Sequence, residues 1–191
     1  MIAVCGLMRS GTSLMMQILA ACGKNCTGEY PYYEAEEVSP YGPLKDEWLN
    51  TLGEDDAFKW LEPHKRPLET REREMRLIVM SRQHHQQAKS YQKFMAAVNP
   101  GHTKKTLEKY RRLTKKNLKN DEHDMRRYLA THVNGLWVDV EFEKLIREPH
   151  EVFETLKKWE ILEEKDRDKM ASQIISRDHM CYKGFLEKEL Q

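Results

Sequence analysis

Within its first thirteen residues the chain gathers two glycines, one arginine and three hydroxyl side chains in a short turn. An apolar run over residues 2–5 leads into Gly6-Leu-Met-Arg-Ser-Gly-Thr-Ser13, and an apolar stretch of good helix formers follows over residues 14–21. This order predicts a strand, a loop and a helix. In such a loop the backbone N–H groups and the positive end of the helix dipole converge, and glycine lets the backbone close around a tetrahedral oxyanion. The sequence therefore predicts an anion-binding loop made by Arg9, Ser10, Gly11, Thr12 and Ser13.

This loop departs from the nucleoside triphosphate signature at one position. Gly6 and Gly11 have the spacing of G-x-x-x-x-G-K-[ST], but Thr12 stands where that signature has lysine. In kinases and ATPases the lysine reaches the β- and γ-phosphates. Its replacement argues for a shorter anion than a triphosphate, with Arg9 as the cation of the loop.

A second informative block begins with a continuous apolar run over residues 77–80, which is typical of a strand buried on both faces of a parallel sheet. Arg82 follows this run, at the carboxyl end of the expected strand, where open α/β sheets bind ligands. Ser90 lies about two turns into the helix that we expect next. Both side chains could therefore bind one phosphate group.

Together these blocks resemble the sulfotransferases that use 3′-phosphoadenosine-5′-phosphosulfate (PAPS). Gly6-x-x-Arg-Ser-Gly-Thr-Ser13 is similar to their 5′-phosphosulfate loop, and Arg82-x7-Ser-Tyr91 is similar to their 3′-phosphate signature. The resemblance implies PAPS as donor, adenosine 3′,5′-bisphosphate as product, and no metal. It also implies that Lys183 and Gly184 belong to a basic loop that closes over the 3′-phosphate. Because ATP lacks a 3′-phosphate, a site built around one would discriminate against ATP.

The resemblance also implies candidates for the catalytic groups. Transfer to a hydroxyl or amine needs a group that takes the acceptor's proton. Three of the four glutamates in the irregular segment over residues 23–43 form a cluster at positions 34, 36 and 37. Its stretch over residues 36–42 resembles the acidic segment of the glycan-modifying branch, which implies Glu37 as the base and Glu36 as the next choice. Lys59 matches the lysine that contacts the transferring sulfuryl group, and Glu62 is a fallback for the base. Cytosolic members have a histidine base where this chain has Leu61.

Four apolar runs, near residues 2–5, 57–61, 77–80 and 136–140, are expected strands with helices between them. They predict one domain over residues 1–191, a three-layer α/β/α sandwich around a central parallel sheet. The resemblance implies the topology of P-loop NTPases. We further expect a short helix over residues 43–52, a helix that begins at Pro149, and two helices within residues 101–132, broken around Asn120-Asp121.

The segment over residues 101–132 is strongly basic, and two interpretations of it stay open. It forms a solvated helical surface over the sheet, or it recruits an acidic acceptor such as an anionic glycan or an acidic peptide. Its cations are Lys104, Lys105, Lys109, Arg111, Arg112, Lys115, Lys116, Lys119, Arg126 and Arg127.

Overall composition narrows the class of protein. The 32 lysines and arginines balance 31 aspartates and glutamates, so net charge predicts no general attraction to nucleic acid or membranes. The sequence has no apolar run of the length that spans a bilayer, its N-terminus lacks the features of a signal peptide, and its four cysteines are compatible with reduced thiols. We therefore expect a cytoplasmic protein without a metal, nucleic-acid or membrane partner.

The expected function is transfer of the sulfuryl group of PAPS to a hydroxyl or amine on a glycan, peptide or small molecule. One alternative is a P-loop kinase with a degenerate loop, which would bind ATP with magnesium and use Asp139 to hold the metal. Another is a non-catalytic adaptor that binds nucleotide without turnover. Neither the acceptor nor the oligomeric state can be predicted from the sequence.

Overall fold

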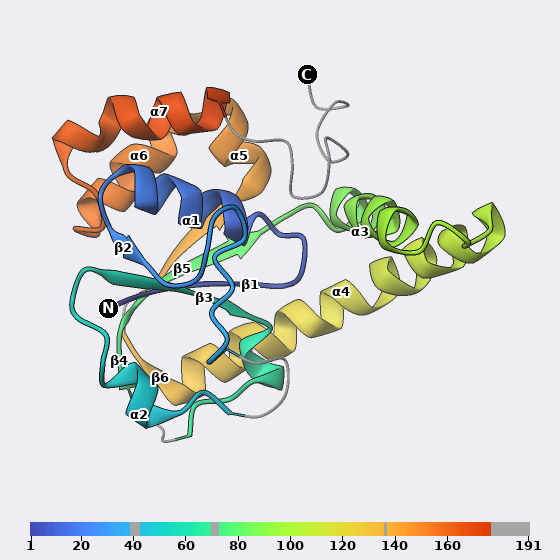
Figure 1. Ribbon diagram of the computed structural model, residues 1–191, viewed down its shortest axis with the longest axis horizontal. Helices are drawn as coiled ribbons and strands as arrows, with labels where there is room; N and C mark the ends of the chain where they lie inside the picture. The colour runs from blue at the N-terminus through green and yellow to red at the C-terminus, as the bar shows by residue number, and fades with distance from the viewer. Residues whose placement is uncertain (39–42, 70–72, 136, 177–191) are drawn as a thin grey trace.

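The fold is known from a computed structural model, which describes residues 1–38, 43–69, 73–135 and 137–176. Its centre is a five-stranded parallel sheet in the order β2-β3-β1-β5-β7 (Figure 1). The four expected strands are confirmed as β1 (Ile2–Gly6), β3 (Asp56–Leu61), β5 (Arg76–Ser81) and β7 (Trp137–Glu141). The fifth, β2 (Asn25–Cys26), is too short to leave a pattern in the sequence. A separate parallel pair joins β4 (Arg73–Glu74) to β6 (Val133–Asn134).

Helices cover both faces of the sheet. On one face lie α1 (Thr12–Ala21), α5 (Phe142–Arg147), α6 (Pro149–Lys158) and α7 (Arg167–Ser176), and on the other lie α2 (Asp46–Leu49) and the inner part of α4 (Lys104–His132) (Figure 1). Within β1, Ile2 and Val4 join the first apolar cluster and Ala3 and Cys5 the second, because successive strand side chains point to opposite faces. The chain is therefore an α/β protein, as expected.

The order in which strands are added to the sheet has a switch point between β1 and β5. From β1 it builds β2 and β3 on one side, then crosses to β5 and β7 on the other. Gly6 at the end of β1 is level with Leu61 of β3 and Met80 of β5. The loops that follow these three strands therefore leave the same edge, at the kind of switch point where open α/β sheets bind ligands.

The segment over residues 104–132 is one helix, so the expected break at Asn120-Asp121 is wrong. Asparagine and aspartate in a helix interior each cost only about 0.7 kcal/mol relative to alanine. Leu118 and Met125, on either side of the expected break, are both buried in the second apolar cluster, and their packing keeps the helix continuous. The Asp121 carboxylate also lies 3.5 Å from Lys65 Nζ.

Other helix predictions had mixed outcomes. The helix expected over residues 43–52 shrinks to α2, because Leu44 pairs with Leu68 in an isolated parallel bridge. The helix expected to begin at Pro149 is confirmed as α6. Two 3-10 turns, η1 (Pro63–Lys65) and η2 (Glu164–Asp166), complete the described elements. None of the described helices has both the length and the apolar character needed to cross a membrane.

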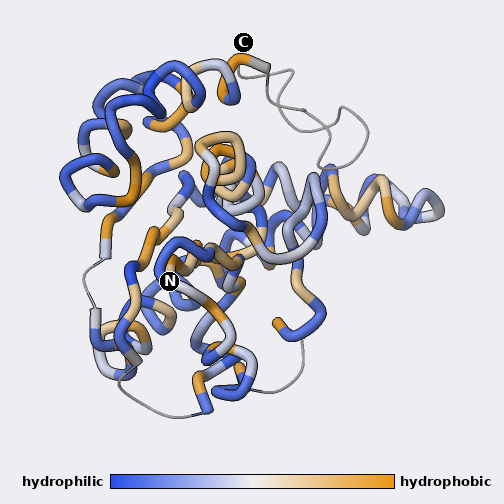
Figure 2. The backbone as a smooth tube through the Cα atoms, turned by 60° about the vertical axis from the view of Figure 1, so that its left-hand side comes forward, coloured by the Kyte–Doolittle hydropathy of each residue, from blue (hydrophilic) through white to orange (hydrophobic). Residues whose placement is uncertain are grey.

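Helix α3 (His84–Val98) follows β5 and packs beside the outer half of α4. This helical pair extends beyond the edge of the sheet in both views (Figures 1 and 2). At its base, His84 Nε2 lies 2.8 Å from Glu122 Oε2. The pair therefore projects from the edge at which β1 and β5 end.

Candidate functional site

The loop after β1 has the backbone expected of an anion cradle. Arg9 and Gly11 have φ angles of 68° and 103°, in the left-handed region that non-glycine residues rarely adopt. The hydrogen-bonding pattern of α1 starts with the Met15 amide donating to Gly11 O at 3.2 Å. The amides of Thr12, Ser13 and Leu14 precede it and have no intrahelical acceptor. The start of α1 therefore presents N–H groups and a positive dipole to an anion.

Glycine is required at position 11 for two reasons. Its φ of 103° is strained for any L side chain, and a Cβ there would lie 2.4 Å from Cδ2 of Phe142. The neighbouring Ser10 is only 1% exposed, and its amide already donates to Leu7 O at 3.1 Å. Its hydroxyl is buried without a hydrogen-bond partner among the described residues. Ser10 thus lies beneath the loop, and Thr12 and Ser13 supply the amides at the start of α1.

Arg9 joins this loop to α3. Its Nε donates to Ser90 Oγ at 3.3 Å, and its guanidinium carbon lies 5.4 Å from the centroid of the Phe94 ring. From the same helix Gln87 Nε2 donates to Met8 O at 2.7 Å. Gln87 had no predicted role, although its spacing of three from Ser90 places the two residues on one face of a helix.

Arg82 lies on the other side of the same loop. Its Nη1 donates to Arg9 O at 3.4 Å, so the structure brings Arg9, Arg82 and Ser90 together. The Arg82 side chain is only 6% exposed, its Nε lies 3.5 Å from Glu143 Oε1, and its guanidinium carbon lies 4.3 Å from the centroid of the Phe142 ring. A buried guanidinium needs such a counter-ion. Arg82 therefore fixes the backbone of the loop through its bond to Arg9 O, and its guanidinium lies close to the predicted anion site.

Glu143 is a second residue that the sequence did not single out. It is 5% exposed on α5, and its other carboxylate oxygen accepts a hydrogen bond from the Gln83 amide at 3.3 Å. It holds Arg82 and the start of α3 in one arrangement. Its position directly after β7 was the available signal, because the carboxyl ends of parallel strands share one edge.

Lys59 connects α1 to the segment over residues 27–38. It is 3% exposed, and its Nζ donates to Glu34 Oε1 at 2.8 Å, to Ser13 Oγ at 3.3 Å and to the carbonyl oxygen of Tyr32. Three acceptors, one of which is the carboxylate counter-ion of Glu34, compensate the burial of its ammonium group. The structure thus places Lys59 at the first turn of α1, beside the predicted anion site.

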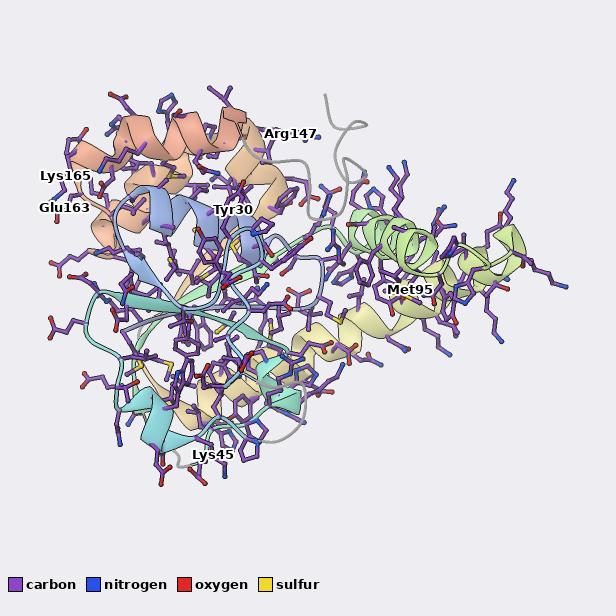
Figure 3. All side chains as sticks on the ribbon, viewed as in Figure 1. Tyr30, Lys45, Met95, Arg147, Glu163 and Lys165 are labelled. Atoms are coloured by element: carbon purple, nitrogen blue, oxygen red, sulfur yellow. The ribbon has the colours of Figure 1, made fainter. Side chains whose placement is uncertain are left out.

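Among the three candidate carboxylates, Glu34 is the one bonded to Lys59, and its side chain is 64% exposed. Glu36 and Glu37 are exposed residues of the same segment. Gln17 Nε2 fixes the segment by donating to Pro31 O at 3.0 Å, which places Tyr30 beside α1 (Figure 3). The sequence could not single out Glu34, because an irregular segment has no periodicity that reveals which side chains point inward.

The remaining candidates lie elsewhere. Lys183 and Gly184 fall outside the described residues. Asp139 is exposed on β7, and its carboxylate lies 2.7 Å from Arg126 Nη1, whereas Glu62 pairs with Lys65 at 2.9 Å. The described part of the chain contains no group of three or more histidine, cysteine, aspartate or glutamate side chains that could hold a metal ion.

Comparison with known proteins adds no assignment. No protein-family model matches this chain, and a search of curated proteins finds no match.

Proposed function

We propose that this protein transfers the sulfuryl group of PAPS to a hydroxyl or amine on an acceptor. One observation carries the proposal: the loop after β1 and the residues after β5 meet through Arg9, which donates to Ser90 Oγ at 3.3 Å and accepts from Arg82 Nη1 at 3.4 Å. Two anion-binding elements at one switch point fit a nucleotide that carries charge on both sides of its ribose. In this proposal Ser90 Oγ donates a hydrogen bond to the 3′-phosphate in place of its contact with Arg9. The positive charge of Arg82 attracts the same phosphate.

The strand order supports the P-loop NTPase-like topology that belongs to this proposal. Strand β1 is central, the loop that follows it leads directly into α1, and β3 and β5 flank it as parallel neighbours. The anion loop therefore has a structured strand on either side. This arrangement holds the loop and the carboxyl ends of both neighbours in fixed relative positions.

The proposed reaction assigns a role to each group at the loop. The acceptor oxygen or nitrogen attacks sulfur, the bond from sulfur to the bridging phosphate oxygen breaks, and adenosine 3′,5′-bisphosphate leaves with the electron pair. Amides at the start of α1, together with Arg9 and Lys59, stabilise the negative charge on the transferring and leaving oxygens. The Glu34 carboxylate takes the acceptor's proton. We prefer Glu34 to Glu36 and Glu37 because its bond to Lys59 holds it beside Ser13.

A metal-dependent kinase is less well supported. Such an enzyme needs an acidic side chain near the loop to hold magnesium. Asp139, the candidate for that role, lies on the outermost strand β7 and pairs with Arg126 of α4. A nucleotide-binding adaptor would share the donor site and differ only in lacking turnover.

Calorimetry separates these functions. We expect adenosine 3′,5′-bisphosphate to bind, ATP with magnesium to bind at least about tenfold more weakly, and Arg82→Ala to reduce bisphosphate affinity roughly 10- to 100-fold, as loss of a charged contact does. Arg147→Ala removes an exposed guanidinium at the end of α5 (Figure 3) and serves as the control. Tighter binding of ATP with magnesium, or no binding of the bisphosphate, would contradict the proposal. Turnover of PAPS with any hydroxyl acceptor then excludes the adaptor.

A further inference from the structure

The outer half of α4 carries a stripe of exposed cations. Between residues 104 and 119 it holds eight lysines and arginines against one acid, Glu108, and all eight are exposed. Among the described residues none of the eight forms an ion pair. We call this surface the basic stripe, and its members are Lys104, Lys105, Lys109, Arg111, Arg112, Lys115, Lys116 and Lys119.

The continuity of α4 puts these cations in register. At about 100° per residue, the eight fall within an arc of about 160°, and they extend over about 22 Å of helix. Every other residue of this stretch apart from Glu108 falls outside that arc. The partly buried Leu107 and Tyr110 and the buried Leu118 occupy a different side of the helix. The expected break at Asn120-Asp121 lies beyond Lys119, so it would not have changed the relative directions of these eight side chains. A bend between residues 104 and 119 would have changed them.

The inner half of α4 shows what ordinary surface charges do in this protein. There Arg126 pairs with Glu122 and Asp139, and Arg127 pairs with Asp124. Asp121 likewise lies 3.5 Å from Lys65 Nζ. Charge is balanced locally on one half of the helix and left unbalanced on the other, although the whole chain has a net charge of only +1. The basic stripe is therefore a local field of one sign, which attracts a polyanion.

The stripe also leads to the candidate site. Lys119 lies one turn before Glu122, whose carboxylate contacts His84 at the start of α3. Farther along α3, Ser90 contacts Arg9 of the anion loop. The α3–α4 pair projects from the same edge of the sheet (Figure 1). A linear molecule lying along the stripe can therefore extend from the outer end of α4 toward the loop.

We infer that the basic stripe binds an acidic polysaccharide, and that this polysaccharide is the acceptor; the second part rests on the proposed function. The arc contains no aromatic side chain on which a base could stack. Recognition of a peptide's apolar side chains uses grooves or pockets, and Leu113 is the one large apolar side chain of this stretch that is prominently exposed, at 48%. A polysaccharide presents regularly spaced sulfates or carboxylates and needs neither feature, and its hydroxyls are possible acceptors.

The test measures binding of the whole chain, without donor nucleotide, to heparin as the sulfated polysaccharide probe, to a duplex DNA and to poly-glutamate. We expect heparin to bind, the other two to bind at least about tenfold more weakly, and heparin affinity to fall steeply between about 0.05 and about 0.2 M salt. A quadruple variant, Lys105→Gln, Lys109→Gln, Arg112→Gln and Lys116→Gln, should lose roughly 10- to 100-fold in affinity. Glutamine keeps a similar helix propensity, and circular dichroism verifies the fold.

The matched control removes four positive charges elsewhere, by Lys144→Gln, Lys157→Gln, Lys158→Gln and Lys165→Gln; Lys165 lies far from the α3–α4 pair (Figure 3). Its heparin affinity should stay within about threefold of the wild type. Equal loss in both quadruple variants, or no heparin binding at low salt, would overturn the inference. Equal or tighter binding of DNA or poly-glutamate would overturn the assignment of polysaccharide. Because no nucleotide is present, failure of the donor site leaves this result unaffected.

Discussion

Arg9 Nε and Ser90 Oγ lie 3.3 Å apart, although 81 residues separate them in the chain. This contact joins the loop after β1 to the helix after β5, at the switch point between the two halves of the strand order. It also gives Arg9 a place beside the Phe94 ring and fixes a charged side chain that an exposed loop would otherwise leave free to move.

Replacing Arg9 tests whether this cation serves the donor. We expect Arg9→Ala to weaken adenosine 3′,5′-bisphosphate binding roughly 10- to 100-fold, because a charged hydrogen bond to a phosphate is lost. Arg9→Lys should recover only part of that loss, since lysine lacks the planar fork of the guanidinium. Calorimetry on both variants, with Arg147→Ala as control, gives the comparison. Unchanged affinity in Arg9→Ala would remove Arg9 from the donor site.

Replacing the candidate bases distinguishes Glu34 from its neighbours. Glu34→Gln should lower kcat about 10²- to 10⁴-fold, the usual range for loss of a general base, while adenosine 3′,5′-bisphosphate affinity changes by less than about threefold. Glu36→Gln and Glu37→Gln, which alter two other exposed residues of the same segment, are expected to stay within about threefold of the wild-type kcat. A large loss in Glu37→Gln alone would restore the assignment that the sequence resemblance implied.

The sequence predicted the strands that frame the site better than the side chains within it. A run such as residues 77–80 is apolar because both faces of the strand are buried. The apolar run by itself therefore predicts the strand. Glu34, Gln87 and Glu143 gave no such signal, since each acts through a contact that only the folded chain creates: with Lys59, with Met8 O and with Arg82. The same reason explains the unbroken α4, in which distant packing of Leu118 and Met125 outweighs local propensity.

The backbone of the anion loop can be tested through stability. Gly11→Ala should lower the free energy of unfolding by about 2–4 kcal/mol, because alanine is strained at a φ of 103° and its Cβ would lie 2.4 Å from Phe142. Gly53→Ala is the matched control, since the nearest atom to its Cβ is 3.7 Å away, and it should change stability by less than about 1 kcal/mol. Urea denaturation measures both. Equal stability of the two variants would contradict the tight packing of Gly11 against Phe142.

His64 predicts a pH dependence of stability. Burial, reinforced by the charge of Lys65, lowers the pKa of His64 below its usual value near 6.5, and both its ring nitrogens are buried without a hydrogen-bond partner among the described residues. Because the unfolded chain binds this proton more readily than the folded one, the neutral ring stabilises the folded state at neutral pH, and this contribution is lost as the pH falls below about 6.5. The free energy of unfolding should therefore decrease with acidification.

His64→Gln removes that titration, so the difference in unfolding free energy between wild type and variant should shrink as the pH falls from about 8 to about 5. Asp121, whose Oδ1 lies 3.8 Å from His64 Nε2, is present in both proteins. His123→Gln changes an exposed histidine of α4 and serves as the control for the loss of a histidine. Urea denaturation at several pH values gives both curves. A pH-independent difference for His64→Gln would show that burial does not suppress protonation of this ring.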